Sequence, residues 1–243
     1  KLLDPELGGL LIKHLKEHRV ALELGKKLIR FEGDDRGQVK RVITTTGSLD
    51  ADLVIMGLGV RPVVDLARNA GLVLGPTGAI RVNDRLQTSD PDIYAGGDCV
   101  EVTHIITGQP IYAPLGSTAN KHGRIIGDNL AGKDSRFRGI LGTYIVRVLD
   151  MAIARTGLTE LEAVQAGFRP VSVIVSALDR PHYMPGSHPL VMKLVANREG
   201  RLLGAQMMVK GDVCRRIDVA AAAISMGVSL EQLTSSSRGF GFS

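Results

Sequence analysis

Residues 88–98 read TSDPDIYAGGD, and this stretch decides how the 243-residue chain is interpreted. We expect a strand here that ends at Asp98, whose carboxylate would then lie at the carboxyl end of a strand, where α/β sheets bind ligands. Gly96 and Gly97 carry no side chains, so a ligand could approach their backbone closely. A tight turn with a solvated Asp98 is the competing interpretation, and the spacing alone favours that turn.

The next segment adds a second feature of a binding site. Residues 114–123 read PLGSTANKHG, and we expect a helix from about residue 116 to 130. The first N–H groups of a helix lack partners within it, and the helix dipole places positive charge at that end. A carboxylate at a strand end and a helix N-terminus would thus follow each other in the chain.

Composition excludes several classes of function. The chain is 44% hydrophobic and 23% charged, which allows a core of useful size. Its net charge of +5 comes from scattered basic residues, and only 4% of residues are aromatic, so we expect no nucleic-acid partner. No apolar run approaches the ~18 residues of a membrane span. Cys99 and Cys214 form no metal-ligand motif, and we expect a reducing, cytoplasmic setting.

The first half of the chain has α/β character. Asp4 and Pro5 predict the start of a helix over about 5–18, followed by a strand at 20–24. Turn residues then divide a strand meander. Residues 52–59, DLVIMGLG, are a continuous apolar run typical of a strand buried in a parallel sheet, and we expect a short helix at 63–70.

The second half has α+β character. The polar segment 132–139 is the best internal boundary, and strand patterns follow it without βαβ alternation. Thr159 and Glu162 have the spacing of a capping box, and a hairpin is expected around 197–200. A helix over about 212–226 would end at Gly227.

The order of several segments resembles one family. Thr88, five further residues and Tyr94-Ala95-x-Gly97-Asp98 are similar to the second flavin fingerprint of FAD-dependent pyridine nucleotide–disulfide oxidoreductases. The segment ADLVIMGLGVRP resembles the strand that leads from that family's NAD-binding domain back to its flavin domain. Further segments resemble the branch of coenzyme A disulfide reductases, NADH oxidases and persulfide reductases: PIYAPLGSTANKHGRIIGDNLAG, GILGTYIVRVLDMAIARTGLTELEA, HYMPGSHP and RLLGAQMMVKGDVCRRIDVAAAAI. The similarity covers residues 1 to about 234.

The resemblance implies an architecture. It would comprise the C-terminal part of an NAD(P)-binding domain at 1–75, the C-terminal part of an FAD-binding domain at 76–133 and an α+β interface domain at 134–243. The two partial dinucleotide-binding segments would be Rossmann-like, and the interface domain would form a homodimer.

The resemblance also implies a reaction, in which a hydride passes from NAD(P)H through FAD to a disulfide, a persulfide or oxygen. It assigns residue roles too. Asp98, after Gly97, would bond the flavin ribityl chain; Pro114, Leu115 and Gly116 would present a helix N-terminus to the pyrimidine side of the flavin; and Gly59 would lie near the nicotinamide. Tyr183, the candidate catalytic residue, matches one of two adjacent tyrosines in coenzyme A disulfide reductases, but the second position is Met184. If the active site is shared across the dimer, Tyr183 would belong to the partner's pocket.

Other features depart from the family. No G-x-G-x-x-G occurs in the 243 residues, and the family's redox cysteine would precede residue 1. We therefore expect structural or surface roles for Cys99 and Cys214. As an isolated polypeptide, the chain could instead be a non-catalytic dimerisation and interaction module.

Several polar groups are expected to be ordinary. His14 and His18 have i, i+4 spacing but no evident third metal ligand, so we expect a solvated helix face and no metal. Arg180 and His182 could meet an anionic substrate or simply lie in a polar loop. The C-terminal residues, SSSRGFGFS, are assigned no structure.

Overall fold

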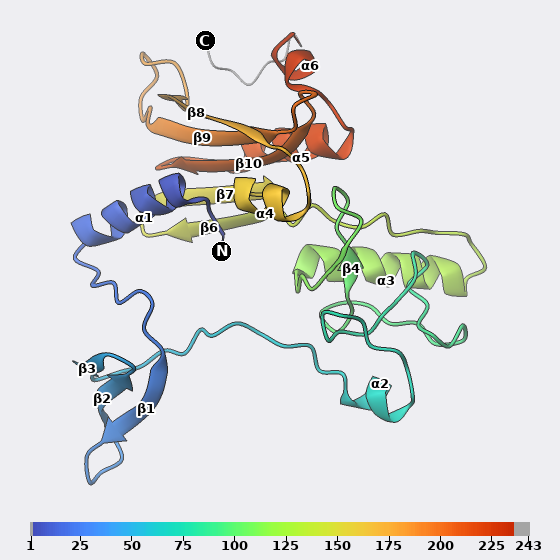
Figure 1. The fold of residues 1–243 in the computed structure, drawn as a ribbon, viewed down its shortest axis with the longest axis horizontal. Helices are drawn as coiled ribbons and strands as arrows, with labels where there is room; N and C mark the ends of the chain where they lie inside the picture. The colour runs from blue at the N-terminus through green and yellow to red at the C-terminus, as the bar shows by residue number, and fades with distance from the viewer. Residues whose placement is uncertain (1, 236–243) are drawn as a thin grey trace. The chain divides into compact units, whose positions relative to one another are not determined.

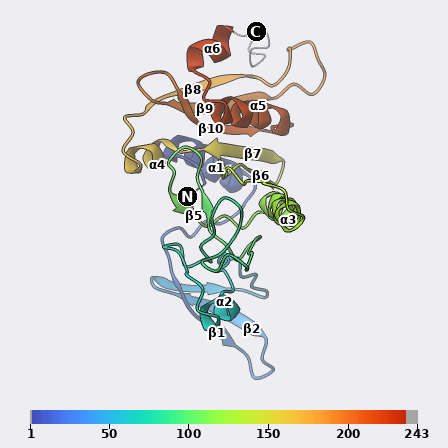
Figure 2. The same ribbon diagram turned by 90° about the vertical axis from the view of Figure 1, so that its right-hand side faces the viewer.

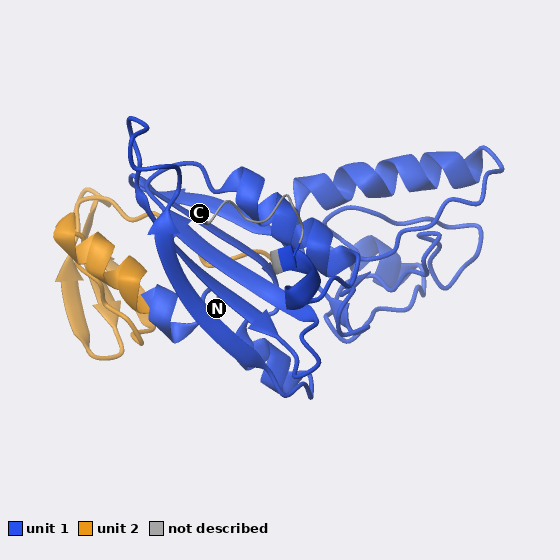
Figure 3. Ribbon diagram, turned by 90° about the horizontal axis from the view of Figure 1, so that it is seen from above, with its two compact units in different colours: residues 1–8, 62–243 blue, residues 9–61 orange. Residues whose placement is uncertain are grey.

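The computed structural model describes residues 2–235. Their contacts divide the chain into two compact units, one of residues 1–8 and 62–243 and the other of residues 9–61 (Figure 3). The expected α/β plus α+β class is confirmed. The domain boundaries at 75/76 and 133/134 remain predictions.

The smaller unit contains a three-stranded antiparallel meander. Its strands β1 (Leu28–Gly33), β2 (Val39–Thr44) and β3 (Gly47–Asp50) pair in sequence order, as the turn residues predict. Helix α1 (Pro5–Glu17) begins in the larger unit and confirms the first predicted helix. The strand expected at 20–24 is wrong, because these residues form a turn and irregular chain.

The apolar run 52–59 is not a buried strand. It has no regular secondary structure, and Ile55 is 87% exposed and Leu58 77% exposed. A buried parallel strand needs a hydrogen-bonded neighbour on each side and a covering layer on both faces. The described residues of the smaller unit pair no strand with this run, so its pattern is not realised.

In the larger unit, residues 62–142 are mostly irregular chain around a small core. This part contains α2 (Asp65–Asn69), the two-stranded pair β4 (Val102–Thr103) and β5 (Pro110–Ile111), and α3 (Gly116–Leu130) (Figure 1). The core includes Val64, Ile80, Val100 and Ala113. The expected strand at 88–98 is wrong: only Tyr94 forms an isolated bridge, to Gln87.

The rest of the larger unit is built on a five-stranded antiparallel sheet in the order β6-β7-β10-β9-β8 (Figure 2). The strands are β6 (Tyr144–Val148), β7 (Met151–Gly157), β8 (Val171–Leu178), β9 (Pro189–Ala196) and β10 (Leu202–Val209). Helix α4 (Glu160–Gln165) starts with the predicted capping box of Thr159 and Glu162. Helices α5 (Cys214–Ser225) and α6 (Leu230–Ser235) follow, and Gly227 has the expected positive φ.

The central strand β10 is buried along its whole length because both faces of the sheet are covered. On one face, Met192, Ala205 and Met207 pack with Ile217 and Ala220 of α5. On the other, Leu203 and Val195 pack with Leu158 and with Ala163 of α4. No described helix is long and apolar enough to span a membrane. Of the C-terminal tail, residues 236–243 lie outside the described residues.

Candidate functional site

The candidate site is the turn that carries Asp98 and the start of helix α3. Gly97 has φ of +82°, a left-handed conformation that favours glycine. The Cys99 thiol donates a hydrogen bond to the Gly96 carbonyl oxygen at 3.4 Å, and the Val100 N–H donates to the Gly97 carbonyl oxygen. These bonds close a tight turn.

Packing requires a glycine at position 96, whereas Gly97 is required for its backbone conformation. A Cβ on Gly96 would lie 3.0 Å from Cβ of His122 and 2.9 Å from Cδ1 of Ile126, both in α3. A Cβ on Gly97 would lie 3.8 Å from Cβ of Ala119. The expectation that Gly96 leaves room for a ligand is therefore corrected, because helix α3 occupies that space.

The turn and the start of α3 lie together. Leu115 precedes the helix in an extended conformation, and it packs against the same core as Ala95 and Cys99. No side chain among the described residues caps α3. Its first N–H groups thus lack a side-chain acceptor from the described part of the protein, and the helix dipole favours negative charge there.

The Asp98 side chain is exposed and makes no hydrogen bond or ion pair with other described residues. Tyr112, which sequence reasoning missed, lies within electrostatic range. Burial raises the pKa of its hydroxyl, and Asp98 and Cys99 raise it further. The larger unit thus carries a free carboxylate acceptor and the free N-terminus of a helix around the same small core. This arrangement suits a ligand with hydroxyl groups and a polar ring.

The other predicted site residues lie elsewhere in the chain. Gly59 has φ of +87° within the exposed run of the smaller unit. Tyr183 is 77% exposed in the loop between β8 and β9, with its ring centroid 5.7 Å from that of His182. Arg180 of this loop pairs with Asp179. The structure joins neither Gly59 nor Tyr183 to the Asp98 turn, and their roles remain predictions.

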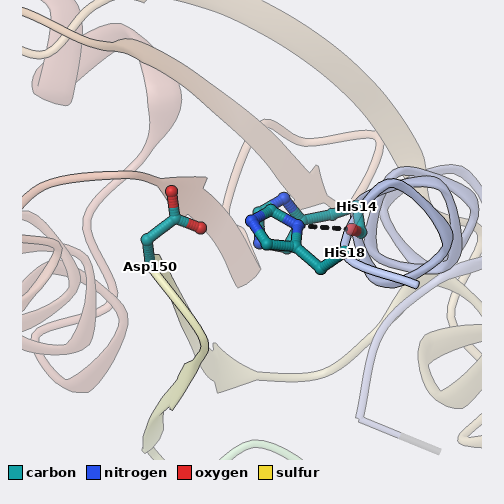
Figure 4. Close-up of side chains that lie close together, drawn as sticks. All are labelled: His14, His18 and Asp150. Carbon is teal, nitrogen blue, oxygen red and sulfur yellow. Dashed lines mark hydrogen bonds between the residues drawn. The ribbon is translucent and has the colours of Figure 1, made fainter. Parts of the chain in front are cut away.

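The remaining candidates have local roles. Cys99 is half-buried against the small core, whereas Cys214 is exposed at the start of α5. A hydrogen bond to Asp212 raises the pKa of the Cys214 thiol. The Nδ1 atom of His18 lies 2.9 Å from the His14 carbonyl oxygen and donates to it (Figure 4). The solvated face expected for these histidines is wrong for His14, which is buried.

A buried polar row crosses the large sheet. Arg155, Gln206 and Lys193 are register partners on β7, β10 and β9. All three are buried. The signal in the sequence was a polar residue within each of three apolar strands, a pattern that implies buried partners.

Lys193 is the centre of this row. Its ammonium group lies 2.7 Å from a carboxylate oxygen of Glu160, 3.0 Å from both of those of Glu6 and 3.3 Å from one of Asp4. Burial disfavours its charge, but the three carboxylates outweigh burial and raise the pKa of Lys193. The cluster joins the start of α1 to the sheet and to α4.

Two family models match the chain, both of the pyridine nucleotide-disulphide oxidoreductases. One covers residues 1–119, and the other, for the dimerisation domain, covers residues 144–237. The chain therefore belongs to the pyridine nucleotide-disulphide oxidoreductase family.

Individual relatives agree with this assignment. A NAD(P)H coenzyme A polysulfide/persulfide reductase of Pyrococcus horikoshii is 41% identical over 92% of this chain and 50% of its own length. An NADH oxidase of Methanocaldococcus jannaschii is 36% identical over 96% of this chain and 51% of its own length. A NAD-dependent persulfide reductase from A. fulgidus has a solved structure that matches 99% of this chain and 45% of its own, with a TM-score of 0.94 and 38% identity. The chain thus spans about half the length of the curated relatives it matches.

Proposed function

We propose that this chain is the C-terminal part of a flavin-dependent NAD(P)H oxidoreductase, which passes a hydride from NAD(P)H through FAD to a disulfide, persulfide or oxygen acceptor. One observation carries the proposal: the Asp98 carboxylate is exposed and has no partner among the described residues, and the uncapped start of α3 lies in the same larger unit. Family membership supplies the redox context.

The residues present fit a flavin. The Asp98 carboxylate would accept hydrogen bonds from the ribityl hydroxyls. Pro114 and Leu115 would lead the chain into α3, so that the N–H end at Gly116 faces the pyrimidine side of the ring and favours negative charge there. Bound FAD would supply the chemistry of accepting a hydride and releasing its electrons. The contribution of these residues is binding and orientation.

The proposed flavin-dependent oxidoreductase also implies partners for this chain. Residues 134–243 would form a homodimer, which the dimerisation-domain match supports. The exposed Tyr183 would then be free to enter the partner's pocket, and Gly59 would lie near the nicotinamide. The two cysteines are free in the described chain, which suits a reducing, cytoplasmic setting.

The acceptor is the finer part of the proposal. The relatives are named persulfide or polysulfide reductases and NADH oxidases. Met184 stands where a second tyrosine would favour a dedicated coenzyme A disulfide reductase. We therefore place a persulfide or oxygen ahead of coenzyme A disulfide as the acceptor.

The test uses protein expressed from the complete coding sequence. It should purify with a flavin spectrum, and NADH or NADPH should bleach that spectrum without oxygen. Oxygen, a persulfide and coenzyme A disulfide are then compared as oxidants of the reduced protein. Protein without flavin, or flavin that neither nucleotide reduces, would refute the proposal.

A second candidate concerns the 243-residue polypeptide alone. The exposed apolar residues Leu53, Ile55 and Leu58 indicate that the sheet expected here is incomplete among the described residues. This observation favours a non-catalytic dimerisation module for the isolated polypeptide. Such a polypeptide should form dimers in sedimentation experiments without oxidising NADH. A monomer would argue against the module, and NADH oxidation would show it to be catalytic.

A further inference from the structure

His122 of α3 is fully buried, although histidine is polar. Its Nδ1 atom lies 3.0 Å from the backbone nitrogen of Gly97, which is the residue before Asp98. A backbone N–H can only donate, so Nδ1 must be the unprotonated acceptor and the neutral ring carries its proton on Nε2. The ring therefore holds the peptide between Gly96 and Gly97, one residue before Asp98.

The surroundings fix this ring in place. Its centroid lies 4.4 Å from that of Phe137, and the two rings meet edge to face at 88°. A Cβ on Gly96 would be only 3.0 Å from the His122 Cβ, so the turn and the histidine are in close packing. Within the described residues, Nε2 is buried and has no hydrogen-bond partner. The Gly97 amide is thus the one hydrogen bond that explains a histidine at this buried position.

The turn needs this acceptor. Gly97 has a positive φ, and glycine adopts positive and negative φ about equally readily. Hydrogen bonds are therefore needed to hold the turn in this one conformation. A buried amide that loses its acceptor is unfavourable, and a turn that moves to reach water would move the attached carboxylate. A ligand that needs Asp98 in one geometry would then bind more weakly, because ordering the turn would oppose binding.

We propose that His122 is a positioning residue for the flavin site, which orients Asp98 through the Nδ1 acceptor bond to the Gly97 amide. The inference rests on the proposed function, since it assumes that Asp98 bonds the ribityl chain of FAD. Burial lowers the pKa of the ring and so keeps it in the neutral form that this bond requires.

The test compares His122→Asn with His122→Leu in protein expressed from the complete coding sequence. The two side chains have the same shape and leave the same gap, but only asparagine places an acceptor oxygen near the position of Nδ1. FAD is removed and titrated back, with flavin fluorescence as the measure of binding. We expect His122→Leu to weaken FAD binding about tenfold and His122→Asn to stay within about threefold of the wild type.

A double-mutant cycle separates positioning from general loss of structure. In an Asp98→Ala background, His122→Leu should weaken FAD binding less than about threefold, because its route to the ligand is already removed. Equal binding by the Asn and Leu variants, or an undiminished loss in the Asp98→Ala background, would overturn the inference alone. If His122→Leu does not fold, a tenfold loss in His122→Asn overturns it, since the acceptor is retained. Wild-type protein that binds no FAD overturns the proposed function and this inference with it.

Discussion

Replacing Lys193 by methionine should strongly destabilise the larger unit. The Lys193 side chain is 1% exposed and that of its partner Asp4 is 2% exposed, whereas Glu6 and Glu160 are 49% and 38% exposed. Methionine fills similar space but removes the ammonium charge, which leaves the Asp4 carboxylate buried without its counter-ion. Breaking a buried pair in this way costs about 3–5 kcal/mol.

Two further contacts limit that loss. The Asp4 carboxylate also accepts hydrogen bonds from the Glu160 backbone N–H at 3.0 Å and from the Gln206 amide at 2.6 Å. Burial raises the pKa of Asp4, but these bonds and Lys193 together hold it below 3.8. The exposed carboxylates should add little, about 0–1 kcal/mol each. We therefore expect the loss to lie in the lower half of that range.

The assay is urea and thermal unfolding at pH 7. A loss of about 3–4 kcal/mol should lower the melting temperature by about 6–16 °C. Lys210→Met is the matched control, because Lys210 pairs with Asp150 at 3.0 Å on the surface and should lose less than about 1 kcal/mol. Adding Asp4→Asn to Lys193→Met should restore part of the stability by removing the stranded charge. If Lys193→Met unfolds like the Lys210→Met control, the reasoning about the buried cluster is refuted.

Four further results are expected. Gly96→Ala should destabilise the protein by about 1–3 kcal/mol, because the added Cβ would meet His122 and Ile126. Gly123→Ala has open space around its Cβ and should stabilise α3 by about 0.5–1 kcal/mol. Equal melting temperatures of the two variants would contradict this expectation. Thr159→Ala should cost about 1 kcal/mol by removing the cap of α4, as urea unfolding would show, and Thr159→Ser should restore it. Burial lowers the pKa of His104 and His122 below 6.5, so the unfolded chain binds these protons first and stability should fall as pH drops below about 6.5, less steeply in His122→Asn. The 243-residue polypeptide alone should purify colourless, and a stoichiometric flavin spectrum would contradict that.

Local signals in the sequence predicted much of the fold. Asp4 and Pro5 marked the start of α1, and the Thr159–Glu162 spacing gave the capping box of α4. The apolar run 52–59 was misread as a buried strand because burial of a strand depends on neighbours, which a sequence pattern does not contain. Asp4 itself serves two helices: its carbonyl oxygen accepts from Gly8 in α1, and its carboxylate accepts from Glu160 in α4.

The site was predicted in part. A sequence motif predicted Asp98 and the start of α3 as parts of the candidate site, and in the structure the residues beside them pack on the same small core of the larger unit. His122, Tyr112 and Lys193 were missed because their roles depend on contacts between residues distant in sequence. His122 lies 25 positions from the amide that it holds, and Lys193 lies 187 positions from Glu6. Only the polar interruption of an apolar strand hinted at Lys193.

The binding of FAD by Asp98 variants tests the central claim most directly. In protein from the complete coding sequence, Asp98→Asn should weaken FAD binding about tenfold or more, because hydrogen bonds to a charged group contribute about 1.5–3 kcal/mol. Asp92→Asn is the matched control, an exposed carboxylate in the same segment, and should leave the affinity unchanged. Equal FAD affinity in the two variants and the wild type would contradict the assignment of this turn as a flavin site.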